Sequence, residues 1–180
     1  MSNRRAFEIA FVGLKPGEHV FEYEINDSFF EPYGLQDFEG CHTRVKLTLI
    51  KENSFLQLKF DVDGFANVQC DRCSNPLKKQ LWDEFNIVVK LVENPDLMNE
   101  QEEDPDIYYI SRGESHIYVA DWIFEFINLS LPMTKMCAEE ERGGDLCNKE
   151  VLHKLEQMEQ NILKEASPIW KGLDKINGLD

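Results

Sequence analysis

The sequence is poor in basic residues and has no hydrophobic run long enough to cross a membrane. Nineteen lysines and arginines stand against 34 aspartates and glutamates among 180 residues, which gives a formal net charge of −15. Such a surface repels phosphate backbones overall, so contact with nucleic acid has to be local or made through another protein. The most apolar window, residues 117–131, is too short to span a bilayer and is interrupted by Asp121, Glu125 and Asn128. No secretory signal pattern fits the first residues, and we therefore expect a cytoplasmic protein.

The chain also lacks the common catalytic motifs. It contains no G-x-x-x-x-G-K-[ST] phosphate loop, no G-x-G-x-x-G dinucleotide motif and no G-x-S-x-G nucleophile elbow. Asp121 and Glu125 share a helix face, but on an otherwise apolar helix they fit a solvated stripe better than an acid–base pair. The histidines are scattered, with none beside a candidate nucleophile: His19, His42, His116 and His153. We therefore expect no enzymatic activity.

Residues 1–92 read mainly as β-strands. Strand-like runs occupy 6–12, 18–25, 44–51, 55–62 and 81–92. The runs 44–51 and 55–62 alternate apolar and polar side chains on either side of the turn at Glu52 and Asn53, which predicts a hairpin. Residues 93–106 then carry seven acidic side chains and no basic one, which is typical of a solvated loop, or else of a docking site for a basic partner. One more strand is expected at 106–110.

Residues 107–180 read mainly as helices. A helix over 117–129 would be apolar except for its stripe of Asp121, Glu125 and Asn128, and Pro132 marks its end. A second helix is expected from Asn148 to about Glu165, followed by a short one near Trp170. The second helix has an apolar seam that either packs on the sheet or pairs with a partner helix: Val151, Leu155, Met158 and Ile162.

Together these patterns predict an α+β fold. It would be an antiparallel, strongly twisted sheet or partial β-barrel with a helical C-terminal half. We expect one folding unit, divided into residues 1–92, an acidic loop at 93–106, and residues 107–180.

The cysteines form the most informative constellation. Cys70 and Cys73 make a C-x-x-C pair, and Cys137 and Cys147 follow with nine residues between them. Four thiolates suit a structural zinc ion, which could join the two halves, and His153 could replace one of them. Two other interpretations stay open: reduced thiols without a metal, and a dithiol redox centre at Cys70 and Cys73. Cys41 lies apart and is expected to be a small apolar filler.

Basic residues gather only around this first cysteine pair. Arg72, Lys78 and Lys79 lie close in sequence, with Trp82 nearby. This small patch is a candidate for a local contact with RNA or with an acidic protein.

The order of these motifs resembles one family. The segment Cys70-Asp71-Arg72-Cys73-Ser74-Asn75-Pro76-Leu77 is similar to the C-x-R-C-x-x-P element of the bacterial YceD family, the large ribosomal RNA subunit accumulation proteins. Asp121, Glu125, the segment Leu129-Ser130-Leu131-Pro132 and Cys137 follow in the order seen in that family. The segment 167–173 is similar to the D-P-R-x-x-x-L ending of its longer members, which carry C-terminal cysteines.

Two departures from the family pattern are visible. Residues 139–141 are glutamates where cysteine-rich relatives carry a second C-x-x-C, which bears on the metal, and Ser167 replaces an aspartate.

The resemblance implies a non-enzymatic role in 23S ribosomal RNA processing or accumulation, hence in large ribosomal subunit biogenesis. The partners would be ribosomal proteins or an rRNA-processing enzyme, with precursor 23S rRNA contacted indirectly. The acidity of the chain fits an adaptor for basic proteins. The alternatives are a thiol–disulfide redox protein using Cys70 and Cys73, or a zinc-stabilised interaction domain unrelated to ribosomes.

Overall fold

A computed structural model of the chain describes residues 4–137 and 147–164. The chain forms two compact units. The first unit comprises Met1–Val68 and Lys78–Met133, and the second comprises Gln69–Leu77 and Thr134–Asp180. The second unit is therefore assembled from a short connection between two strands and from the C-terminal part of the chain.

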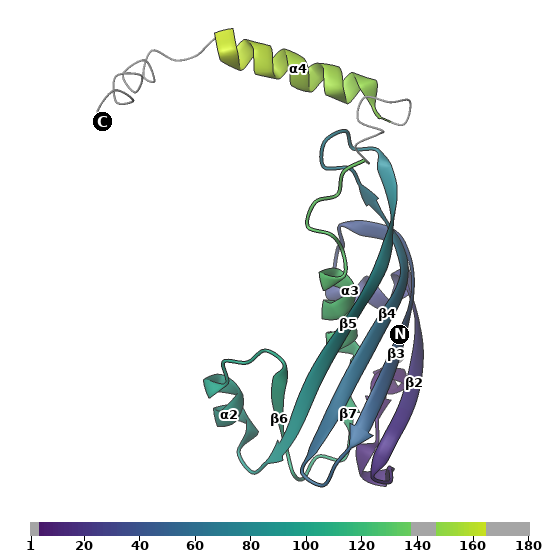
Figure 1. Cartoon of the computed structure of the whole chain (residues 1–180), viewed down its shortest axis with the longest axis vertical. Helices are drawn as coiled ribbons and strands as arrows, with labels where there is room; N and C mark the ends of the chain where they lie inside the picture. The colour runs from purple at the N-terminus through teal and green to yellow at the C-terminus, as the bar shows by residue number, and fades with distance from the viewer. Residues whose placement is uncertain (1–3, 138–146, 165–180) are drawn as a thin grey trace, which may run out of the picture. The chain divides into compact units, whose positions relative to one another are not determined.

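A five-stranded sheet forms the body of the first unit (Figure 1). Its strands, in spatial order, are β2 (Gly17–Asn26), β3 (Phe38–Lys51), β4 (Phe55–Gln69), β5 (Pro76–Val92) and β6 (Ile107–Ser111). β3 is antiparallel to both β2 and β4, which confirms the predicted hairpin, whereas β6 is parallel to β5. The α+β class is thus confirmed, but the sheet is mixed rather than wholly antiparallel, and the described strands do not close into a barrel.

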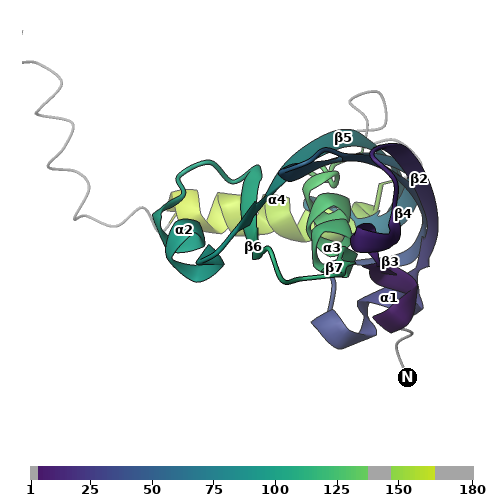
Figure 2. The same cartoon turned by 90° about the horizontal axis from the view of Figure 1, so that it is seen from below.

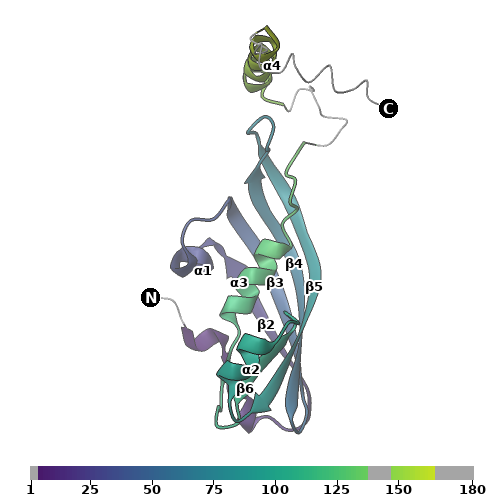
Figure 3. The ribbon, with the colours of Figure 1, turned by 90° about the vertical axis from the view of Figure 1, so that its left-hand side faces the viewer.

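The core lies between this sheet and α3 (Ala120–Leu129). Every second side chain of β3 and β4 is buried, including Leu47, Leu49, Leu58 and Phe60, because alternate residues of a strand face the same side. The sheet curves around α3, which lies along its concave face (Figures 2 and 3). Phe126 of α3 contacts Phe60, with ring centroids 5.0 Å apart. The predicted polar stripe is confirmed, because Asp121 and Glu125 are exposed on the same helix.

The N-terminal segment differs from the prediction. Only β1 (Glu8–Ile9) is a strand within the predicted run 6–12, and it is flanked by the 3-10 turns η1 (Arg4–Phe7) and η2 (Phe11–Gly13). β1 pairs antiparallel with β7 (Ile117–Tyr118), so α3 begins three residues later than predicted, at Ala120. A tertiary pairing that local sequence does not encode therefore changes both segments.

The acidic segment 93–106 is not wholly a loop. It contains α2 (Pro95–Gln101), which joins β5 to the parallel strand β6. The side chain of Asn99 accepts a hydrogen bond from the Tyr109 N–H (2.8 Å) and donates one to the Tyr109 carbonyl oxygen (2.9 Å). Parallel neighbours need such a crossover, because a tight turn can join only antiparallel strands.

The connection between β2 and β3 contains α1 (Asp27–Phe30) and the 3-10 turn η3 (Glu31–Tyr33). The Asp27 carboxylate accepts the N–H groups of Gly40 and Cys41, at 2.9 and 2.7 Å. Cys41 itself is buried in the core of the first unit, in line with its predicted role as a filler.

The described part of the C-terminal segment contains α4 (Lys149–Lys164). The Asn148 side chain accepts the Val151 N–H at 3.3 Å, so the predicted helix and its N-terminal cap are confirmed. The short helix predicted near Trp170 lies outside the described residues. None of the helices that the structure describes has the length and apolar character of a membrane-spanning segment.

Candidate metal centre

The second unit is organised around the C-x-x-C pair. The Cys70 carbonyl oxygen accepts the Ser74 N–H, and the Cys70 N–H donates to the Asn75 carbonyl oxygen, both at 2.8 Å. Ser74 adopts a left-handed conformation with φ 58°, which completes this tight turn. The turn brings Cys70 and Cys73 to one place, and both side chains are buried.

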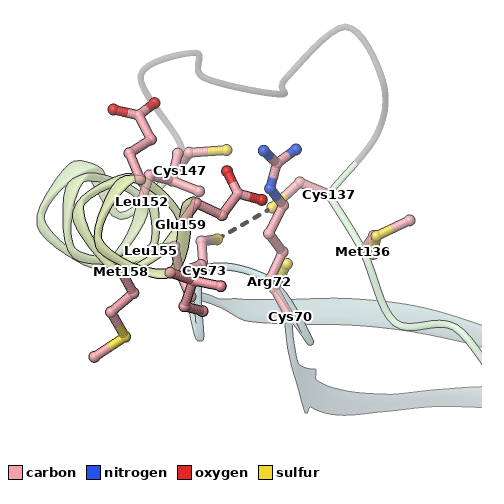
Figure 4. Close-up of a pocket in the computed structure, with 12 residues that line it drawn as sticks. Cys70, Arg72, Cys73, Met136, Cys137, Cys147, Leu152, Leu155, Met158 and Glu159 are labelled. Carbon is pink, nitrogen blue, oxygen red and sulfur yellow. Dashed lines mark hydrogen bonds between the residues drawn. The ribbon is translucent and has the colours of Figure 1, made fainter. Parts of the chain in front are cut away.

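A pair of hydrogen bonds holds the segment before Cys137 against this turn. The Asp71 N–H donates to the Lys135 carbonyl oxygen, and the Lys135 N–H donates to the Asp71 carboxylate, both at 2.7 Å. These bonds place Cys137 so that its sulfur lies 3.7 Å from the sulfur of Cys73 (Figure 4). This role of Asp71 was not predicted from the sequence, although aspartate side chains in turns commonly accept hydrogen bonds from backbone N–H groups.

Three of the four predicted cysteines converge. The sulfur atoms of Cys70, Cys73 and Cys137 all lie within 4.8 Å of one another, close enough to bind one metal ion. Cys147, just before α4, is buried in the same cluster and its thiol interacts with Cys137, but its sulfur lies outside this group of three. His153 is not part of the cluster, because it lies exposed on α4, where its ring contacts Gln157 at 2.9 Å.

The spacing of the sulfurs fits a tetrahedral metal. With metal–sulfur bonds of about 2.3 Å, tetrahedral geometry places two thiolates about 3.8 Å apart. The observed 3.7 Å between Cys73 and Cys137 matches this value, whereas a disulfide needs about 2.05 Å. The donor set consists of soft sulfur ligands, which favour zinc and similar ions over magnesium or calcium.

The thiols are electrostatically unequal. Burial alone would raise the pKa of Cys70, but hydrogen bonds from the backbone N–H groups of Cys73, Arg72 and Cys137 lower it to about 6. Burial and the neighbouring thiols of Cys70, Cys73 and Cys147 raise the pKa of Cys137. Inward-pointing N–H groups stabilise a thiolate in the way that a metal-binding turn requires.

An apolar cavity of about 510 Å³ adjoins the cysteine cluster within the second unit (Figure 4). The predicted seam of α4 supplies one wall of this cavity through Leu155, Met158 and Ile162. These three side chains are 42%, 61% and 70% exposed, so the seam is far from fully covered. Arg72 reaches the same cavity from the C-x-x-C turn.

The predicted basic patch is divided between the two units. Arg72 belongs to the second unit, whereas Lys78 and Lys79 belong to the first, where they lie on β5. The Lys78 ammonium lies 3.4 Å from the centroid of the Phe65 ring, so this cation is already engaged within the first unit.

Replacing Asp71 with alanine tests its contribution to the cluster. The Lys135 N–H loses its acceptor in this variant, so Cys137 is held less firmly beside Cys73. We expect metal affinity to fall by roughly tenfold, the lower end of the range for residues that orient metal ligands. Competition with a chromogenic zinc chelator measures the change.

The matched control is Asp71→Asn, which keeps a side-chain oxygen as acceptor and should retain most of the affinity. Equal affinities for the alanine variant and the unaltered chain would contradict the positioning role of Asp71.

These features define an α+β protein with a separate cysteine-rich unit suited to binding a metal ion. The family model described as large ribosomal RNA subunit accumulation protein YceD matches residues 58–177, two thirds of the chain. The chain therefore belongs to the YceD family, as its motifs indicated, and the family name supports a ribosome-related role. No curated protein and no solved structure matches the chain.

Proposed function

We propose that the chain is a non-enzymatic, cytoplasmic factor in 23S rRNA processing or accumulation, and thereby in large ribosomal subunit biogenesis. The observation that carries the proposal is the family match, which includes the C-x-x-C turn, α3 and the C-terminal cysteines. We further propose that the chain acts as an adaptor for proteins, either basic ribosomal proteins or an rRNA-processing enzyme. Precursor 23S rRNA would then be reached indirectly.

The charge distribution supports the adaptor role. The net charge of −15 opposes direct binding to bare RNA and favours basic proteins. Acidic side chains are exposed on the sheet at Glu18 and Glu22, and on α3 at Asp121 and Glu125. These exposed carboxylates would attract the lysine and arginine side chains of a basic ribosomal protein to the first unit.

We propose that the ion of the cysteine cluster is zinc and that its role is structural. Cys70, Cys73 and Cys137 would hold it, and Cys147 of the same buried cluster would complete the site as the fourth ligand. Four thiolates fill a tetrahedral site and leave no position for a substrate or water, so the ion would supply stability rather than Lewis-acid chemistry. The cluster would join the strand connection to the C-terminal segment within the second unit.

Depletion of the protein from growing cells tests the ribosomal role. We expect the ratio of 23S to 16S rRNA to fall and 23S precursors with unprocessed ends to accumulate, because large-subunit assembly loses a factor that small-subunit assembly does not use. Gel quantification and mapping of precursor ends measure both effects. Re-expression of the unaltered chain should restore the ratio.

Two outcomes would contradict this proposal in different ways. An unchanged 23S to 16S ratio, together with rapid reduction of insulin disulfides by the purified chain, would favour the redox alternative at Cys70 and Cys73. In that alternative the Cys70 thiol, whose pKa is lowered to about 6, would be the nucleophile. Capture of naked 23S fragments without proteins at physiological salt would contradict the adaptor role alone.

A further inference from the structure

The first unit contains an aromatic-walled cavity of about 460 Å³, none of whose lining residues belongs to the cysteine cluster. Its lining residues come mainly from α2, β6, β7 and α3, and β6 is an edge strand of the five-stranded sheet. Four aromatic side chains line it: Tyr108 and Tyr109 of β6, Tyr118 of β7 and Trp122 of α3. Four carboxylates line it as well: Asp96, Glu114, Asp121 and Glu125.

The aromatic pair is arranged to expose one ring. The rings of Tyr108 and Trp122 meet edge to face at 90°, with centroids 5.5 Å apart. Trp122 also packs against the buried ring of Phe60, with ring centroids 6.3 Å apart. Tyr108 is 45% exposed, so part of its π surface is available to a ligand. Aromatic faces attract cations through their quadrupole, and a planar guanidinium can also stack on them.

The charge of the lining side chains is negative, and the nearby Lys90 ammonium lies 5.3 Å from the centroid of the Tyr109 ring. None of the lining residues is a lysine or an arginine, and His116 is the only lining side chain able to carry a positive charge. In the part of the chain that the structure describes, none of the four carboxylates takes part in an ion pair. Asp121 does accept the hydroxyl of Tyr33, at 2.7 Å.

The walls are held in place by hydrogen bonds of the fold itself. The two bonds between Asn99 and the Tyr109 backbone fix α2 against β6. The Tyr109 hydroxyl donates to Glu102 at 2.6 Å and ties the end of α2 to the same strand. On the other side, Tyr33 stacks on Phe124 and holds Asp121. A preformed site loses little conformational entropy when a ligand binds.

We propose that this cavity binds an arginine side chain of a basic partner protein. The guanidinium stacks against Tyr108 and donates hydrogen bonds to the carboxylates around it, which is the combination that arginine satisfies better than lysine. The identity of the partner as a basic protein rests on the proposed adaptor function, whereas the cation site rests on the cavity itself. The acidic segment 93–106 thus supplies one carboxylate of the site, Asp96 on α2.

Binding of a fluorescently labelled peptide of alternating arginine and glycine to the full chain tests the proposal. We expect Tyr108→Ala and Glu125→Gln each to weaken binding by roughly fivefold at physiological salt, in line with one cation–π contact or one charge-assisted bond. The same peptide with citrulline in place of arginine keeps the shape without the charge and should not bind. The lysine peptide should bind more weakly than the arginine peptide.

Two matched control variants remove similar groups away from the cavity. Trp82→Ala removes an exposed aromatic side chain of β5, and Glu52→Gln removes an exposed carboxylate at the turn between β3 and β4. Both should bind the peptide within twofold of the unaltered chain. Equal weakening by Glu52→Gln and Glu125→Gln would mean diffuse attraction to an acidic surface and would overturn the proposal. Displacement of the peptide by an equal concentration of spermidine would mean that the cavity binds a free polycation. That result would overturn the proposal that its ligand is an arginine of a partner protein.

The binding assay and the depletion experiment test the cavity proposal and the ribosomal role independently of one another. If depletion lowers 23S rRNA but Tyr108→Ala binds the peptide normally, the cavity proposal is overturned and the ribosomal role stands. If the cavity variants lose the peptide but depletion leaves 23S rRNA unchanged, the cation site stands and the ribosomal role falls. Chains carrying both Tyr108→Ala and Glu125→Gln should fail to restore the 23S to 16S ratio if both proposals hold.

Discussion

Cys70→Ser is expected to abolish metal binding and to destabilise the second unit heavily. Cys70 is one of three sulfurs that lie within 4.8 Å of one another. Among the residues that the structure describes, Leu77, Met136 and Leu152 pack against this cluster. The proposed structural zinc ion would contribute roughly 10 kcal/mol or more to folding of the second unit. Metal content by mass spectrometry and protection of the second unit from proteolysis measure the two effects.

The matched control for this prediction is Cys41→Ala. Cys41 is equally buried but lies in the core of the first unit, where its sulfur contacts the Thr43 hydroxyl at 3.3 Å. This variant should keep its full metal content. An unchanged metal content and melting temperature in Cys70→Ser would show that the cluster holds no ion.

Phe60→Ala is expected to be the most destabilising substitution in the first unit. Phe60 is completely buried and contacts both Phe126 and Trp122 of α3, at centroid distances of 5.0 and 6.3 Å. Removing the ring leaves a cavity between β4 and α3, and such substitutions cost about 3–5 kcal/mol of unfolding free energy. Urea denaturation followed by circular dichroism in the β-sheet region measures this loss.

Trp82→Ala serves as the control, because Trp82 lies on β5 and is 74% exposed. Its unfolding free energy should stay within about 0.5 kcal/mol of the unaltered chain, as for most surface substitutions. A loss for Phe60→Ala no larger than that for Trp82→Ala would mean that α3 does not pack on the sheet as described.

Elements with strong local patterns were predictable from the sequence. The β3–β4 hairpin follows from alternation of apolar residues through Leu47, Leu49, Leu56 and Leu58, because half-buried strands have a period of two. α4 follows from Asn148 and the seam behind it. The C-x-x-C turn was equally readable, and Cys137 and Cys147, which the sequence singled out by residue type, lie in the same buried cluster.

Elements that depend on distant pairing were not predictable in the same way. β1 is a two-residue strand that exists because it meets β7, more than 100 residues later, and no local alternation signals it. The parallel direction of β6 likewise depends on the crossover through α2. α2 itself had a signal that was outweighed by the acidic composition: Pro95 stands in its first turn with Asp96 beside it, a combination typical of helix starts.

The division of the basic patch has a similar cause. Arg72, Lys78 and Lys79 are close in sequence, but the boundary between the two compact units falls between Leu77 and Lys78. A contact made by all three residues with RNA or a protein stays a prediction. The arginine site proposed above was not predicted from the sequence, because Asp96, Tyr108 and Trp122 come from three elements with no shared motif.

The discontinuous second unit imposes an order on how the newly made protein matures. Cys73 precedes Cys137 by 64 positions, so the turn that holds Cys70 and Cys73 leaves the ribosome well before the remaining thiols exist. At synthesis rates of about 5–20 residues per second, this interval lasts several seconds. All strands of the first unit and α3 are complete by Leu129, before Cys137 is made. We therefore expect the sheet to fold during translation while only Cys70 and Cys73 of the cluster are present, and metal capture to follow after Cys137 and Cys147 have been made.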